Sequence, residues 1–202
     1  MNKQDVESNF YNVLKGNITI LEFEKWVYNI DEELLNKSFG NDFYFELISL
    51  NYKDKHVMNE LEKLLFSKVP FGRFEEVKIR KLLEDVIDDK GILVEIIEEL
   101  YDLYCDGYRF LMDIGLAYVY YGMPREHETY NFTEQTRTKL KSEAKRILSF
   151  LNTRKIIITG EYEYEDLREE SDKIELHSLE NMYLSPKKSF INKIIGEVKG
   201  SR

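Results

Sequence analysis

The sequence predicts a mainly α-helical fold, because apolar residues recur at spacings of three and four along most of its 202 residues. Capping signals and glycines divide these periodic stretches, so the individual helices are expected to be short. Only three prolines are present, and few positions therefore interrupt a helix by removing a backbone donor. Short turns favour antiparallel neighbours, in either a helical bundle or a short α-solenoid-like stack.

The N-terminal region contains a well-defined helix start. Thr19 and Glu22 have the spacing of a capping box, in which the hydroxyl accepts from a backbone N–H and the carboxylate reaches back. The helix that follows carries Ile20 and Phe23 on one side. Residues 30–70 are predicted to continue as short helices separated by polar turns.

The clearest helical pattern spans residues 79–106. Acidic residues occupy one side of two consecutive helices, and apolar residues occupy the other. The apolar positions are Ile79, Leu82, Leu83, Val86 and Ile87, followed by Leu93, Ile96, Ile97, Leu100 and Tyr104. Residues 108–121 are apolar nearly all round, which predicts a central, buried helix.

The C-terminal part changes character after a loop that begins at Gly122. Thr133 is predicted to cap a long helix. Beyond it, residues 155–159, 162–165 and 173–177 have β-branched or alternating patterns, typical of a small antiparallel sheet. A terminal amphipathic helix completes the chain.

Two segments describe the expected domain organisation. A chain of this length supplies one sizeable hydrophobic core, or one core with a small appendage. We expect a helical body over residues 1–123. Residues 124–202 are expected to pack on it as one unit, because the apolar face of the terminal helix is too large to leave in water.

The net charge of −9 is distributed unevenly. Residues 1–120 contain 14 Lys/Arg and 24 Asp/Glu, whereas residues 121–202 contain 15 and 14. An acidic body repels nucleic-acid phosphates and attracts basic surfaces. No apolar run is long enough to cross a membrane, and the polar start lacks the apolar stretch of a signal peptide. With Cys105 as its only cysteine, the protein is expected in the cytoplasm.

No familiar catalytic or metal-binding motif is present: the glycines form no phosphate loop, and no nucleophile elbow or paired zinc histidines occur. We therefore predict a non-enzymatic protein with no metal and no cofactor. One alternative is a small metal-dependent hydrolase or nuclease, since acids that converge from adjacent strands can hold a hard cation. Its ligands would be Glu163, Glu165, Asp166 and His177.

A second alternative is a nucleic-acid-binding regulator that uses the basic helix at residues 139–155. Its cations are Lys139, Lys141, Lys145, Arg146, Arg154 and Lys155. Nucleic acid requires a continuous basic stripe without nearby acids. Glu143 interrupts this stripe and the acidic body would repel the phosphates, so nucleic acid is not an expected partner.

The acidic sides of the two consecutive helices are the most suggestive functional feature. Such sides are ordinarily solvated, but neighbouring helices can combine them into one anionic surface that steers a basic protein. The fourteen tyrosines supply candidate anchors for an interface. The predicted partner-binding residues are Glu84, Asp85, Asp88, Glu95, Glu98, Glu99 and Asp102.

Residues 19–28, 45–53 and 100–108, the last leading into Phe110-Leu111, together resemble a family of small bacterial proteins, mostly uncharacterised. Some members look like immunity proteins of polymorphic-toxin systems. The likeness covers about the first 120 residues, and the C-terminal remainder departs from it. It implies a protein that binds and neutralises a cognate toxin, often a nuclease or another basic enzyme.

Overall fold

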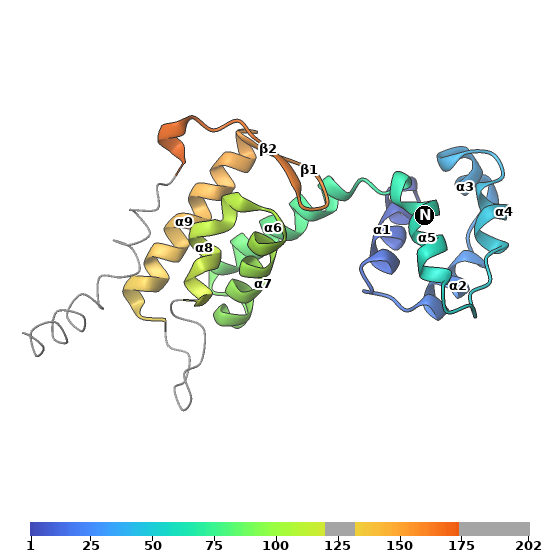
Figure 1. The fold of residues 1–202 in the computed structure, drawn as a ribbon, viewed down its shortest axis with the longest axis horizontal. Coiled ribbons are helices and arrows are strands. Elements are labelled where there is room, and N and C mark those ends of the chain that lie inside the picture. Colours follow the sequence, from blue (N-terminus) through green and yellow to red (C-terminus); the bar gives the residue numbers. More distant parts are fainter. Residues whose placement is uncertain (120–131, 174–202) are drawn as a thin grey trace, which may run out of the picture. The chain divides into compact units, whose positions relative to one another are not determined.

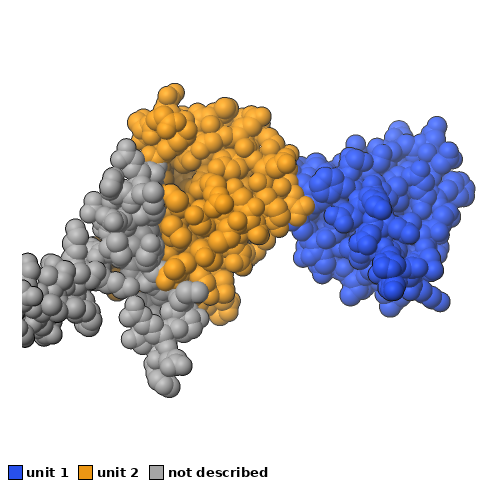
Figure 2. Space-filling view, in the orientation of Figure 1, with its two compact units in different colours: residues 1–74 blue, residues 75–202 orange. Residues whose placement is uncertain are grey.

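The structure is a computed structural model that describes residues 1–119 and 132–173. It is mainly helical with a small two-stranded antiparallel sheet, which confirms the predicted fold class. The chain divides into two compact units, residues 1–74 and 75–202, shown in different colours in Figure 2. Each unit contains its own cluster of buried apolar residues.

Figure 1 shows the helices of unit 1. They are α1 (Lys3–Leu14), α2 (Ile20–Val27), α3 (Glu32–Phe39), α4 (Phe43–Ile48), α5 (Val57–Leu65) and the 3-10 turn η1 (Phe66–Lys68). Their buried apolar cluster includes several aromatic side chains. Phe10 is fully buried. Its ring centroid lies 5.2–6.2 Å from those of Phe23, Trp26, Phe39 and Phe43, so one α1 side chain joins three other helices.

Helix α2 begins with the predicted capping box. The Thr19 N–H donates to Glu22 Oε2 at 2.8 Å, and the Glu22 N–H donates to Thr19 Oγ1 at 3.2 Å. These hydrogen bonds from Thr19 lower the pKa of Glu22. A second capping box, between Asn2 and Asp5, starts α1 in the same way.

Unit 2 combines helices with a β-hairpin. Its elements are α6 (Phe71–Asp88, whose first turn belongs to unit 1), α7 (Leu93–Asp106), η2 (Arg109–Leu111), α8 (Met112–Ala117), α9 (Glu134–Asn152), β1 (Ile156–Gly160), β2 (Glu163–Asp166) and η4 (Glu170–Asp172). Thr133 caps α9, as predicted. Buried residues of α6, α7, α8, α9 and β1 form one cluster, which includes Leu100, Ile114 and Ile147.

Helices α7 and α8 pack at very short distance. A Cβ on Gly115 would lie 3.0 Å from the Tyr101 Cα and 3.1 Å from the Leu100 carbonyl oxygen, so glycine permits this approach. The single buried helix predicted for residues 108–121 is instead a 3-10 turn followed by α8.

The β-hairpin attaches to the helices through Tyr108. Strands β1 and β2 are antiparallel, with Ile158 opposite Tyr164, and they match two of the predicted strands. The fully buried Tyr108 donates its hydroxyl hydrogen to the Gly160 carbonyl and accepts from the Tyr162 N–H, both at 2.9 Å. One phenol therefore holds both sides of the turn.

Several predicted features lie outside the described residues. They are the expected boundary between residues 123 and 124, residues 174–177 of the third predicted strand, the terminal helix, and His177. Within the described part of the chain, no helix combines the length and the apolar character needed to cross a membrane.

Candidate protein-binding surface

Helix α7 exposes a row of carboxylates. They recur at spacings of three and four, so they share one helix face, while Ile97 on the opposite side is fully buried. All four members are exposed. We define the α7 carboxylate row as Glu95, Glu98, Asp102 and Asp106.

The carboxylates of this face lie close enough to repel one another. Partial burial raises the pKa of Asp102, and the negative charges of Glu98, Asp106 and Glu99 raise it further. Lys78 acts in the opposite direction. Neighbouring carboxylates of the row therefore repel one another, and a cationic partner would reduce this repulsion.

The predicted acids on α7 differ in their contacts. Glu99 is partly buried and pairs with Lys78 of α6 at 2.8 Å. Glu98 accepts a hydrogen bond from the Tyr118 hydroxyl at 2.7 Å. Glu95 forms no ion pair with any residue in the described ranges. The α7 part of the predicted surface therefore keeps most of its charge.

The predicted acids on α6 are largely neutralised by neighbours. Asp85 pairs with Lys81 at 2.6 Å, one helical turn away. Asp88 pairs with Lys90 at 2.7 Å, and this hydrogen bond and charge lower the pKa of Asp88. Glu84 is exposed. The structure thus places the stronger anionic surface on α7 rather than equally on both helices.

The sequence suggested tyrosines as candidate anchors, but it did not identify which of them accompany the carboxylate row. Tyr101 and Tyr104 extend from α7, and Tyr118 directly follows α8. The Tyr101 ring centroid lies 6.3 Å from that of Tyr104 and 5.7 Å from that of Tyr118. Tyr104, which the sequence places on the apolar side of α7, is partly buried against the core of unit 2. The spacing of three residues between Tyr101 and Tyr104, which places them on neighbouring parts of one helix face, was the available sequence signal.

The acids proposed for a metal-dependent enzyme do not converge among the described residues. Glu163 and Glu165 are exposed on one face of β2. Asp166 lies on the other face and binds Arg168 through two side-chain hydrogen bonds, of 2.8 and 2.7 Å. No group of three potential metal ligands occurs in residues 1–119 and 132–173, and His177 lies outside those ranges.

Several cations of the basic helix also have acidic partners. Lys141 pairs with Asp89, and Lys155 pairs with Asp172 at 2.7 Å. Arg146 lies between two carboxylates, as described below. These pairs reduce the positive potential that phosphate binding requires.

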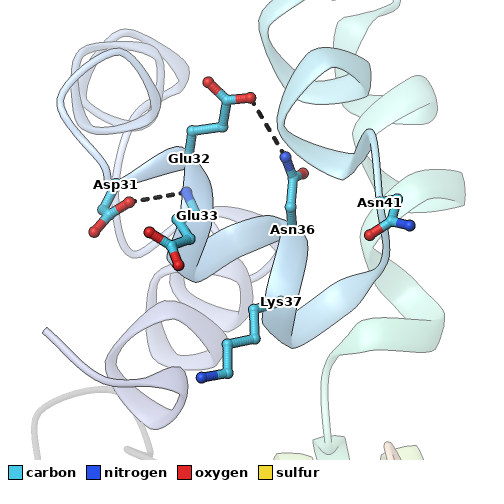
Figure 3. A pocket seen from close by; sticks show the side chains of 6 residues that line it. All are labelled: Asp31, Glu32, Glu33, Asn36, Lys37 and Asn41. Atoms are coloured by element: carbon cyan, nitrogen blue, oxygen red, sulfur yellow. Dashed lines mark hydrogen bonds between the residues drawn. The ribbon is translucent and has the colours of Figure 1, made fainter.

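Unit 1 has an open, polar concavity of about 810 Å³ at the start of α3 (Figure 3). Its lining residues are Asp31, Glu32, Glu33, Asn36, Lys37 and Asn41. Asp31 is used for capping: its carboxylate accepts from the Glu33 N–H at 2.8 Å. The side-chain amide oxygen of Asn36 accepts from the Tyr44 N–H at 3.0 Å. Asp31 and Asn36 therefore serve to stabilise α3 and its connection to α4.

A buried ionic network joins α8 to α9. Arg146 donates to both oxygens of Glu143, at 2.8 and 2.7 Å, and its guanidinium lies 3.6 Å from the Asp113 carboxylate. Only 4% of Asp113 and 7% of Glu143 is exposed. Burial, together with the charge of Glu143, raises the pKa of Asp113 to about 6, while Arg146 and Arg168 oppose the rise.

We expect this raised pKa to appear in the pH dependence of stability. Native Asp113 binds its proton more tightly than the unfolded chain does, so its effect favours folding at low pH and is lost as pH rises through 6. Between pH 5 and pH 7.5, wild type should lose about 1 kcal/mol relative to Asp113→Asn. Urea denaturation of both proteins at both pH values measures this difference. Equal changes in the free energy of unfolding of wild type and Asp113→Asn between the two pH values would contradict the prediction.

Comparisons with known proteins provide no relative for this chain: no protein-family model matches the sequence, and no similar curated protein or solved structure was found. The resemblance to immunity proteins therefore stays a hypothesis, and the surface itself provides the functional argument.

Proposed function

We propose that this chain is a non-enzymatic, immunity-like protein that acts in the cytoplasm and neutralises a basic toxin domain by covering its cationic surface. The α7 carboxylate row is the proposed contact surface. The observation that carries the proposal is the placement of four exposed carboxylates at spacings of three and four on one face of α7.

Charge complementarity supports a basic protein as the partner. Residues 75–119 contain twelve Asp/Glu and five Lys/Arg, so the negative charge of the described part of unit 2 is concentrated in α6, α7 and α8. A cationic surface placed over α7 would replace repulsion by attraction and would accelerate association. A toxin enzyme that acts on an anionic substrate carries such a cationic surface. Covering that surface would prevent the substrate from binding and would thereby inhibit the enzyme.

The direct test combines co-expression with association kinetics. The protein is co-expressed with the product of the adjacent gene, and the purified complex is measured by biolayer interferometry from 50 to 300 mM salt. We expect association to slow as salt increases. Reversal of Glu95, Glu98 and Asp102 to Lys should slow association at least about tenfold at low salt, because rim charges act mainly on the association rate.

A matched variant separates the surface from the net charge. Glu32→Lys, Glu33→Lys and Glu62→Lys together change the charge equally, at exposed positions of unit 1. We expect this control to slow association much less than the α7 reversal. If the two variants slow association equally, or if salt has no effect on the wild-type rate, α7 is not the binding surface.

A further inference from the structure

A pair of tyrosine rings lies beside the α7 carboxylate row. The rings of Tyr101 and Tyr118 have centroids 5.7 Å apart and an interplanar angle of 34°. Both residues are partly buried, so protein atoms support them while part of each ring stays accessible. The two rings therefore add an aromatic surface beside the negatively charged α7 carboxylate row.

A hydrogen bond from Tyr118 and contacts between the rings fix the orientation of the pair. The Tyr118 hydroxyl donates to Glu98 Oε1 at 2.7 Å, which ties the ring following α8 to the carboxylate row. The Tyr101 ring contacts the rings of Tyr118 and Tyr104, with centroids 5.7 and 6.3 Å away. Rings that are positioned before binding lose little conformational entropy when a ligand group stacks on them.

Tyr104, which neighbours this pair of rings, already contacts an arginine of the same chain. The Arg109 guanidinium carbon lies 5.2 Å from the ring centroid of Tyr104, within the range of a cation–π contact. Tyr104 is the other ring neighbour of Tyr101, at 6.3 Å. The local geometry is therefore suited to a planar cation over a tyrosine.

We propose that Tyr101 and Tyr118, with the carboxylates of Glu98 and Asp102, form a subsite for an arginine side chain of the partner protein. This inference rests on the proposed function and adds the identity of the cation that the surface selects. A guanidinium stacks on aromatic rings and donates two parallel hydrogen bonds to a carboxylate, whereas the lysine ammonium is a strongly hydrated point charge.

The test compares two peptide probes of equal charge, nona-arginine and nona-lysine, by calorimetry at 50 mM salt. We expect wild type to bind nona-arginine more tightly. In Tyr101→Leu/Tyr118→Leu, the ratio of the two affinities should fall about threefold, while nona-lysine affinity changes less than twofold, because the ammonium groups of nona-lysine do not depend on the stacking contact. An unchanged ratio would overturn the subsite.

Two further variants make the comparison specific. Tyr101→Phe/Tyr118→Phe retains both rings and should retain the arginine preference. Tyr104→Leu removes a ring that Arg109 already covers, so it should leave the ratio unchanged. A ratio that falls as far in Tyr104→Leu as in the double leucine variant would place the selectivity elsewhere.

A measurement on wild type covers the case in which the double leucine variant does not fold. Methylguanidinium and methylammonium chloride are titrated while the ¹³C-labelled tyrosine rings are observed by NMR. We expect methylguanidinium to shift the Tyr101 and Tyr118 signals and methylammonium to shift them much less, and equal shifts would overturn the proposal. Equal binding of the two peptides would overturn the subsite alone, whereas binding of neither would overturn the proposed function too.

Discussion

Gly107→Ala is expected to destabilise unit 2 by about 2–4 kcal/mol, the largest effect that we predict for a single substitution. Two costs add at this position. Gly107 has a φ of +151°, which side chains rarely adopt, and its new Cβ would lie 2.8 Å from the Tyr162 carbonyl oxygen. That oxygen belongs to the backbone of the hairpin turn, so it cannot move without disturbing the turn.

Gly40→Ala is the matched control for this substitution. Gly40 also has a positive φ, +124°, but an added Cβ would meet no atom within 4 Å. Its cost should therefore be the backbone strain alone, on the order of 1–3 kcal/mol. Urea denaturation followed by far-ultraviolet circular dichroism measures both variants. Equal losses of stability would show that the contact with the hairpin contributes nothing.

Tyr108→Phe is expected to cost about 2–3 kcal/mol in the free energy of unfolding. The substitution keeps the buried ring but removes the hydroxyl that donates to the Gly160 carbonyl and accepts from the Tyr162 N–H. The Gly160 carbonyl and the Tyr162 N–H then both lose this partner. Tyr162 has a φ of +60°, so its strained backbone also loses a contact that holds it.

Denaturation of Tyr108→Phe should be compared with that of Tyr28→Phe. Tyr28 is 55% exposed, so removal of its hydroxyl should change stability by less than about 0.5 kcal/mol. A Tyr108→Phe variant as stable as this control would contradict the role assigned to the phenol. A loss confined to the hairpin amides, detected by hydrogen exchange, would support it.

The parts of the fold that the sequence predicted depend on local signals. The Thr19–Glu22 capping box, the Thr133 cap and the apolar period of α7 all involve residues within a few positions of each other. The division into two hydrophobic cores does not. Spacing identifies which face of a helix is apolar, but it does not identify the helix against which that face packs.

The same distinction explains the candidate surface. The row on α7 follows from helical period alone, and the pair of Lys81 with Asp85 has the familiar i,i+4 spacing. The pairs Lys78–Glu99 and Lys141–Asp89 join residues that are far apart in the sequence, so no local pattern predicts them. The packing of Tyr118 against Tyr101 likewise depends on the close approach of α7 and α8 at Gly115.

The double hydrogen bond of Tyr108 also determines the order in which unit 2 assembles. The phenol and the two backbone groups that it joins are separated by 52 and 54 residues, so the bond requires closure of a long chain segment. The hairpin tip cannot acquire its native form until η2 and the end of α7 are in place. Its amide hydrogens should therefore gain protection late in refolding, although the turn itself is short.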